Sequence, residues 1–138
     1  MSRHKARVLA FQALFSYDVG GEGLEDLLTL NWAENAGELD TETSDFARML
    51  IAGTVNHLPE VDSCIKGHLA PKWHFDRLNR VTVAILRISI FSLLYQKDMP
   101  VNVVIDQAIK ISKEFGEDDA FKFINAMLDN ISKGLPAD

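Results

Sequence analysis

The side chains that could do chemistry in this chain are few, and their spacing favours none of the common catalytic or metal sites. The histidines His4, His57, His68 and His74 lack the four-residue spacing with which two histidines on a helix bind zinc. Cys64 is the only cysteine, and a single cysteine on a short helix is more often a small buried side chain than a nucleophile. We therefore expect no metal site, no cofactor and no catalytic cysteine.

The acidic pair Asp118-Asp119 offers two neighbouring carboxylates, which can do acid–base chemistry in other settings. The pair follows Gly116 at the start of a predicted helix. A carboxylate there caps free N–H groups and interacts favourably with the helix dipole. Because capping explains the pair with fewer assumptions, we expect that the protein is not an enzyme.

The remaining chemistry is that of a binding surface, and the run Arg3-His4-Lys5-Ala6-Arg7 is its clearest part. These bases lie at a predicted helix start, where free N–H groups and the helix dipole also attract anions. Single-stranded RNA is a ligand of this kind when planar side chains are also available for its bases. If the last helix lies beside the first, Lys122 would add a base and Phe123 a planar ring. A core position is the alternative for Phe123, because Ala120, Phe123 and Met127 form an apolar row. Ordinary solvated charges at a chain terminus are the alternative interpretation.

The charges are segregated along the chain. The formal net charge is −6, which by itself argues against a nucleic-acid ligand. However, residues 1–17 hold three bases and no acid, and residues 18–62 hold eleven acids and one base. Residues 63–113 hold eight bases and three acids. An acidic block can keep a protein soluble while a separate basic face binds a phosphate backbone.

The elements that would position these residues are helices, and the central one is predicted at 78–97. From Leu78 to Tyr95, twelve of eighteen residues are apolar, and the only charges are Arg80 and Arg87. Apolar side chains fall on nearly every side at a 3.6-residue period, as in a buried helix. Two β-strands are the alternative, because Val, Ile and Thr are frequent, but no turn signal interrupts the stretch. A membrane span is not expected, since Arg87 would lie in mid-bilayer.

Six further helices are predicted from apolar periodicity, capping residues and the glycines and prolines between them. Ser2 is the expected cap of the first, and Asn102 of the sixth in the chain. Their approximate ranges are 2–19, 24–36, 41–57, 59–70, 103–115 and 118–133. We therefore predict an all-α fold of about seven helices, forming a single domain over residues 1–138. The absence of a secretion signal and of a cysteine pair fits a cytoplasmic protein.

Several segments, taken together, carry a family resemblance. They are Arg3 to Arg7, Ala10-Phe11-Gln12-Ala13-Leu14-Phe15, Ala84-Ile85-Leu86-Arg87-Ile88, Met99-Pro100-Val101, Ile105 to Gly116 and Lys122-Phe123-Ile124-Asn125. In order and approximate spacing they resemble the NusB family of bacterial transcription antitermination factors, over essentially the whole chain.

The resemblance implies an all-helical bundle of two packed subdomains that binds both RNA and protein partners. It implies binding to single-stranded RNA of the boxA element in ribosomal RNA leader transcripts. It also implies a heterodimer with the small-subunit ribosomal protein that acts as NusE. The pair would join RNA polymerase and other Nus factors so that transcription passes terminators. Both a free monomer and a homodimer that hides the basic helix are compatible with it.

The resemblance also implies site residues in three groups. An RNA-contacting start corresponds to Arg3, His4, Lys5 and Arg7, with Gln12 one face along. The edge of the last helix near the RNA corresponds to Asp119, Lys122 and Phe123. The side used by the ribosomal-protein partner corresponds to Thr82 and Arg87.

Two alternatives stay open beside this interpretation. The first is a protein-interaction module of the same fold that binds the partner but not RNA, which the acidic balance would suit. The second is the NusB-like domain that is fused elsewhere to an RNA cytosine methyltransferase, although these 138 residues contain no methyltransferase domain.

Overall fold

The computed structural model describes residues 1–136, which form seven α-helices, two short 3₁₀-helices and no strand. The α-helices are α1 (Arg3–Val19), α2 (Leu24–Leu28), α3 (Thr41–Asn56), α4 (Leu58–Gly67), α5 (Arg80–Tyr95), α6 (Val101–Phe115) and α7 (Ala120–Lys133). The 3₁₀-helices are Ala36–Glu38 and Phe75–Arg77. The predicted all-α class and number of helices are confirmed.

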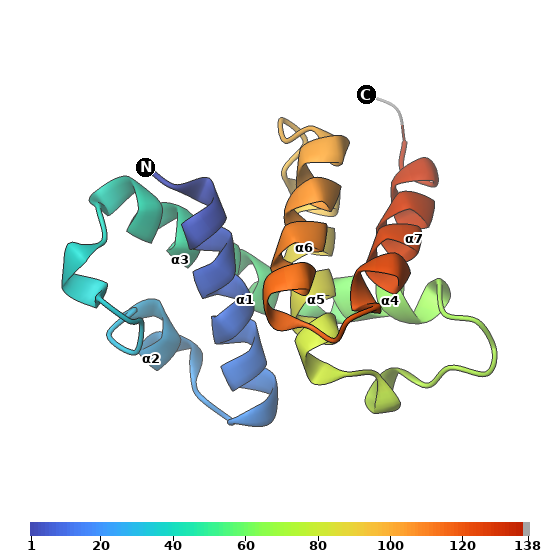
Figure 1. Cartoon of the computed structure of the whole chain (residues 1–138), viewed down its shortest axis with the longest axis horizontal. Coiled ribbons are helices and arrows are strands. Elements are labelled where there is room, and N and C mark those ends of the chain that lie inside the picture. The colour runs from blue at the N-terminus through green and yellow to red at the C-terminus, as the bar shows by residue number, and fades with distance from the viewer. Residues whose placement is uncertain (137–138) are drawn as a thin grey trace.

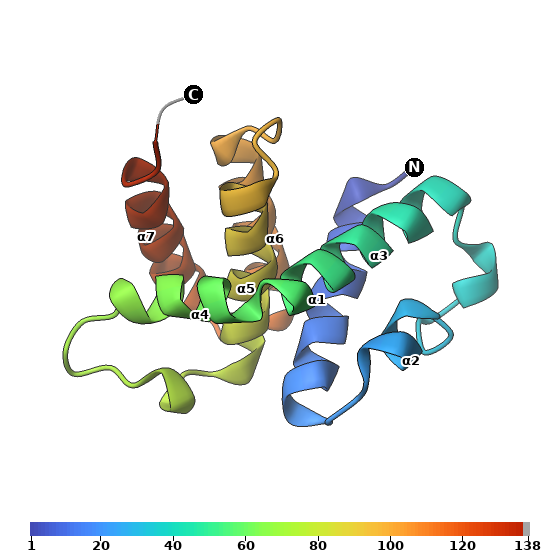
Figure 2. The ribbon, with the colours of Figure 1, turned by 180° about the vertical axis from the view of Figure 1, so that it is seen from behind.

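The helix α5 lies at the centre, with most of the other helices packed around it (Figures 1 and 2). Every residue from Thr82 to Leu93 is buried, as the apolar pattern on all sides predicted. The helices α1, α2 and α3 pack on one side of it and α6 and α7 on the other, while α4 crosses the back (Figure 2). Within residues 1–136, no helix is both long and apolar enough to cross a bilayer.

Side-chain caps mark the starts of three of the seven described α-helices, namely α1, α3 and α5. Ser2 Oγ accepts from the backbone N–H of Lys5, as predicted. Asn79 Oδ1 accepts from the N–H groups of the first turn of α5, a cap that the sequence reading missed. The predicted cap Asn102 is wrong, because α6 already begins at Val101. The carbonyl oxygen of Pro100 accepts the first helical hydrogen bonds instead.

The predicted helix over 24–36 is also wrong, because α2 ends at Leu28. Thr29 Oγ1 donates to the carbonyl oxygen of Asp26 and accepts from the N–H of Asn31, which competes with helical hydrogen bonding. Leu30 then adopts a left-handed φ of 59° and is 2 % exposed. The burial of its side chain compensates for this unfavourable backbone conformation.

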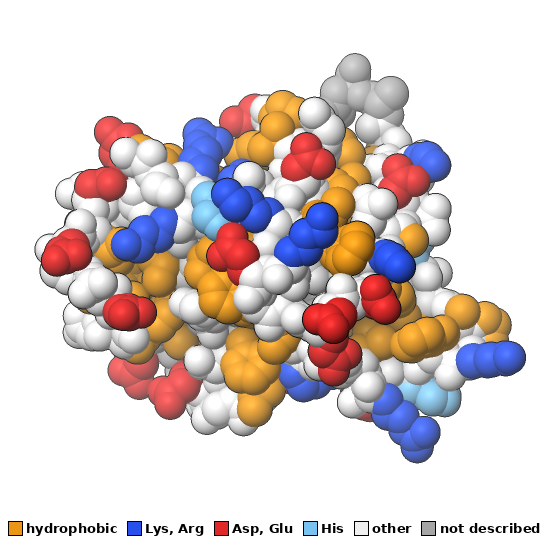
Figure 3. All heavy atoms as spheres, in the orientation of Figure 1, with side chains coloured by type: hydrophobic (Ala, Val, Ile, Leu, Met, Phe, Trp, Pro, Cys, Tyr) orange, Lys and Arg blue, Asp and Glu red, His pale blue; other side chains and the backbone are white. Residues whose placement is uncertain are grey.

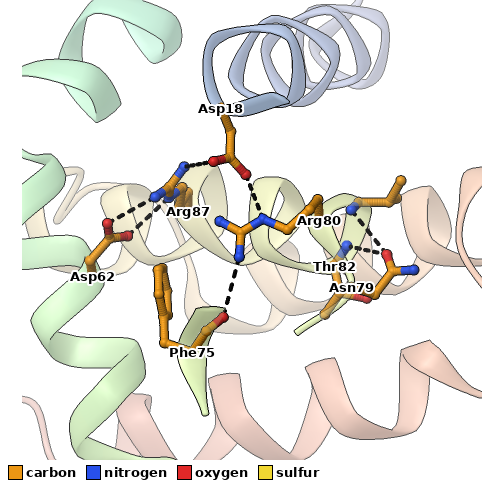
Figure 4. Close-up of polar contacts among 8 residues, drawn as sticks. Asp18, Asp62, Phe75, Asn79, Arg80, Thr82 and Arg87 are labelled. Carbon is orange, nitrogen blue, oxygen red and sulfur yellow. Dashed lines mark hydrogen bonds and ion pairs between the residues drawn. The ribbon is translucent and has the colours of Figure 1, made fainter. Parts of the chain in front are cut away.

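Two arginines of α5 form ion pairs with acidic side chains from two other helices (Figure 4). Arg87 Nε and Nη2 donate to the two carboxylate oxygens of Asp62 at 2.9 Å, and Nη1 lies 4.0 Å from Asp18 Oδ1. Arg80 Nε donates to Asp18 Oδ2 at 2.7 Å, and its Nη1 donates to the carbonyl oxygen of Phe75 at 3.2 Å. The network therefore joins α1, α4 and the loop before α5 to the central helix.

A close approach of α3 and α5 depends on Gly53. A Cβ built at this position would lie 2.6 Å from Phe91 Cε1, well inside van der Waals contact. The Phe91 ring is 6 % exposed and packs against His57 and Tyr95, so it has little room to move. The missing side chain at Gly53 lets the two helices pack at their observed separation.

Gly53→Ala should therefore destabilise the protein. Overpacking a core costs about 1–3 kcal/mol, and the better helix propensity of alanine offsets about 1 kcal/mol of it. Urea unfolding followed by circular dichroism would measure the loss. Gly67→Ala is the matched control, since a Cβ there meets nothing within 4 Å and should leave stability unchanged or raise it. Equal stability of the two variants would contradict the packing argument.

Arg87→Met should destabilise the protein more strongly, because Asp62 and Asp18 would lose a cation that is 5 % exposed. We expect a loss of about 3 kcal/mol, the lower end of the range for breaking a buried pair. The two aspartates remain 18 % and 20 % exposed, so water can resolvate them in part. Lys133→Met removes the exposed pair with Asp129 and should change stability by less than about 0.5 kcal/mol. Similar losses in both variants would show that the Arg87 network is not structurally important.

Candidate nucleic-acid interface

The start of α1 presents Arg3 and Lys5 to solvent, as predicted. This helix start is held against the start of α3 by a chain of hydrogen bonds. The N–H of Ser2 donates to Thr43 Oγ1 at 2.9 Å, and Thr43 donates from both its N–H and its hydroxyl to the carboxylate of Asp40. Hydrogen bonding to Thr43 lowers the pKa of Asp40, so the carboxylate that fixes this corner is charged at neutral pH.

Arg7 is more deeply buried than the other bases of the run, although Arg3 also lies over the Phe46 ring, 4.9 Å from its centre. It is 6 % exposed, and its guanidinium lies 5.5 Å from the centre of the Phe46 ring and donates to Met99 Sδ at 3.4 Å. Burial, and then repulsion from Arg3, lowers its pKa. The structure therefore places Arg7 beneath the surface, where it packs α1 against α3 and the loop before α6. A direct contact of Arg7 with RNA stays a prediction.

His4 is also engaged within the protein. Its Nδ1 lies 2.8 Å from Gln107 Oε1 and its Nε2 lies 3.1 Å from Glu114 Oε1. Both partners belong to α6, so His4 joins the start of the basic helix to the neighbouring helix. Gln12 was predicted to contact RNA from a neighbouring face of the same helix. It is half-buried further along α1.

The C-terminal group of predicted site residues does not lie beside the first helix. The helix α6 lies between α1 and α7 and contacts both (Figures 1 and 2). Asp119, Lys122 and Phe123 lie at the start of α7, next to the loop between α4 and α5. Lys122 Nζ and Asp119 Oδ1 are 3.5 Å apart and both side chains are largely exposed. The condition under which Lys122 and Phe123 would complete the N-terminal site, that the last helix lies beside the first, is therefore not met.

The intervening helix contributes two bases that the sequence reading missed. Lys110 and Lys113 are exposed on the outer side of α6, opposite the buried Val104, Ala108 and Ile111. Their helix lies between α1 and α7. Lysines and arginines are spread over one side of the molecule with acids among them (Figure 3). We call Arg3, Lys5, Lys110, Lys113 and Lys122 the basic face. The three-residue spacing of Lys110 and Lys113 on a polar stripe was the signal that could have identified them.

Phe123 meets the α4–α5 loop rather than the N-terminal helix. Its ring stacks on the Trp73 ring with centroids 5.6 Å apart and planes 25° apart. A hollow of about 550 Å³ beside this pair is also lined by Arg77, Asn79 and Asp119, among others. The structure therefore brings Asp119 and Phe123 together with a loop to which no function was assigned from the sequence.

The two residues predicted to face the ribosomal-protein partner are both buried. Thr82 is 5 % exposed, and its N–H donates to Asn79 Oδ1, although the residue borders the hollow beside Trp73 and Phe123. Arg87 is 5 % exposed and engaged by Asp62 and Asp18 (Figure 4). Direct contacts of Thr82 and Arg87 with a partner stay predictions.

The arrangement suits electrostatic binding better than covalent chemistry. Burial raises the pKa of the half-buried Cys64 thiol, which lowers the fraction of reactive thiolate. The residues that the structure describes contain no group of three or more histidine, cysteine or acidic side chains that could hold a metal ion. The basic face, by contrast, presents separated cations of the kind that neutralise phosphates.

Known proteins match the chain along most of its length. The NusB family model matches residues 4–133. The transcription antitermination protein NusB of Treponema denticola is 47 % identical over 131 residues, which cover 95 % of this chain and 96 % of that protein. The solved structure of T. maritima NusB matches with a TM-score of 0.86 at 34 % identity, covering 97 % of this chain and 92 % of that chain.

A second solved structure that the chain resembles holds NusB in a complex. It is a crystal structure of antitermination factors NusB and NusE in complex with dsRNA, and one of its chains matches with a TM-score of 0.85 at 28 % identity. The match covers 98 % of this chain and 100 % of that chain. The all-helical fold, the basic first helix and the match over residues 4–133 agree with one another, and the chain belongs to the NusB family.

Proposed function

We propose that residues 1–138 form one domain that acts as an RNA-binding transcription antitermination factor in the cytoplasm. It binds single-stranded RNA of the boxA type together with the ribosomal protein that acts as NusE, and it joins RNA polymerase with other Nus factors. The observation that carries this proposal is the basic face, because α1 and the consecutive helices α6 and α7 place exposed cations on one side of a protein with a net charge of −6.

The basic face contributes affinity through charge. Cations that neutralise phosphates release counterions, so the affinity falls as salt rises. With about three to five phosphate contacts on a single strand, the slope of log K against log salt is roughly −2 to −3.5. Such affinity is modest, and a protein partner that contacts adjacent RNA adds to it by raising the effective concentration. Base contacts and stacking, rather than the cations, supply the sequence preference.

Four of the predicted residues support this function from inside the protein. His4 joins α1 to α6 and Arg7 packs α1 against α3, so both position the exposed bases at the start of α1. Arg87 and Thr82 are buried in α5, where they support the side that the resemblance assigns to the ribosomal protein. We assign these four residues to positioning.

The alternative is an interaction module that binds the protein partner without RNA. It is favoured by the acids that interrupt the basic face, since Asp106 and Glu114 are exposed on the same helix as Lys110 and Lys113. The two functions differ in one measurable respect: only the first requires exposed cations on α1.

Arg3→Gln combined with Lys5→Gln should weaken RNA binding and make it less sensitive to salt. Removal of two phosphate contacts lowers the magnitude of the salt slope by about 1.4 for a single strand. Fluorescence anisotropy of a labelled boxA-type RNA, titrated with the protein at several salt concentrations with and without the ribosomal protein, measures both quantities.

Lys133→Gln is the control for this titration, because Lys133 is an exposed base that lies outside the basic face. It should leave the slope unchanged. Binding of the ribosomal protein should be the same for the double variant and the wild type. If the wild type binds the ribosomal protein but no RNA in either condition, the interaction module is the correct function. If the double variant keeps the wild-type slope, the basic face on α1 is not the RNA site.

A further inference from the structure

Trp73 is an exposed aromatic side chain whose position is not explained by core packing. It lies in the loop between α4 and α5 and is 55 % exposed. One side of its ring stacks on Phe123 of α7, with centroids 5.6 Å apart and planes 25° apart. An indole of this exposure leaves a flat apolar surface in water, and a planar ligand group can stack on such a surface.

The loop that carries Trp73 is held in place rather than free. The N–H of Trp73 donates to the carbonyl oxygen of Ala70 at 2.9 Å. Two residues further on, the Phe75 ring lies 5.1 to 5.7 Å from the cationic groups of Lys66, Arg80 and Arg87. Arg80 also donates to the carbonyl oxygen of Phe75 (Figure 4). The backbone around Trp73 is therefore held in place and its ring rests on Phe123, which lowers the entropy that binding would cost.

Trp73 borders two hollows of different chemical character. The first, of about 550 Å³, is shared with Phe123 and contains the carboxylates of Glu117 and Asp119. Carboxylate oxygens accept hydrogen bonds from the amino groups of bases. The second, of about 380 Å³, contains Lys66 and His74, and the exposed Lys72 precedes Trp73 in the loop. Carboxylates outnumber cations in the first hollow, which Arg77 also lines, and Lys66 and His74 outnumber the single carboxylate of Asp76 in the second.

We propose that the Trp73–Phe123 pair is a stacking platform for an unpaired RNA base. The base stacks on the indole beside Glu117 and Asp119, which accept from its amino group, and the adjoining phosphate lies toward Lys66 and Lys72. The inference rests on the proposed function and extends the RNA path beyond the basic face to the α4–α5 loop. A base with an exocyclic amine fits this hollow better than uracil, because uracil has no amino group to donate to the carboxylates.

Stacking by Trp73 predicts a loss of affinity without a change in salt sensitivity. Trp73→Ala should weaken binding of the boxA-type RNA, in the presence of the ribosomal protein, by roughly 5- to 150-fold. The salt slope should stay at the wild-type value, because no phosphate contact is removed. Trp73→Phe should keep most of the affinity. Thermal unfolding should show little change, since the replaced side chain is exposed.

The two tryptophans of the chain allow a direct optical test. In Trp32→Phe protein the only indole is Trp73, and its emission should fall when the RNA saturates the protein. In Trp73→Phe protein the only indole is Trp32, which follows α2, at the opposite end of the molecule from α7 (Figure 1), and its emission should not change. An abasic nucleotide at the stacked position should abolish the quenching and weaken binding to Trp32→Phe protein but not to Trp73→Ala protein.

The outcomes separate this inference from the function on which it rests. If RNA binds but Trp73→Ala matches the wild type, or Trp73 emission is unchanged at saturation, the platform is wrong and the proposed function stands. If Trp73 emission responds to the ribosomal protein alone and Trp73→Ala weakens that complex instead, the pair is a protein contact and the inference is overturned. If the wild type binds no RNA, both the proposed function and the platform fail.

Discussion

The structure depends on how a helix that is apolar on nearly every side accommodates two arginines. Buried cations are stable only when they are paired and hydrogen-bonded, and the pairs for α5 come from outside it. Asp18 at the end of α1 serves both Arg80 and Arg87, and Asp62 of α4 binds Arg87 through two hydrogen bonds. These contacts help to fix the positions of α1 and α4 relative to the central helix. Arg80 and Arg87 also lie near the Phe75 ring, so the same two side chains position the basic helix and the loop that carries Trp73.

The charge distribution is a product of the fold as much as of composition. The acidic block over 18–62 forms α2, α3 and their connections, away from the side on which α6 and α7 lie. The bases of α1, α6 and α7 meet on one side only because α6 packs between the other two helices. An electrostatic surface of this kind can attract a polyanion although the net charge is −6, since salt screens charges more than about 10 Å away.

Membership of the NusB family and the geometry of the chain bear on different questions. The family match accounts for the fold and motivates the proposed partners. The contacts within this chain assign separate tasks to residues that the resemblance treated alike. Arg3 and Lys5 are exposed, although Arg3 also contacts Phe46 and Met99. His4 is held by α6, and Arg7 is buried against Phe46 and Met99. Replacing all four residues together would therefore mix a loss of phosphate contacts with a loss of packing.

The sequence by itself determined the helical class, the buried central helix and most helix boundaries, because these follow from local periodicity and from caps such as Ser2. It failed where local hydrogen bonding competed with helix propensity, at Thr29 and Leu30, and where Pro100 rather than Asn102 set a helix start. Within the candidate site, it identified Arg3, Lys5, Lys122 and Phe123 as exposed or aromatic groups of interest. Only the tertiary structure decided that Arg7, Thr82 and Arg87 are buried, that Lys110 and Lys113 join the basic face, and that Trp73 stacks on Phe123. Those facts depend on which helices become neighbours, and that choice is made by packing between segments far apart in the chain.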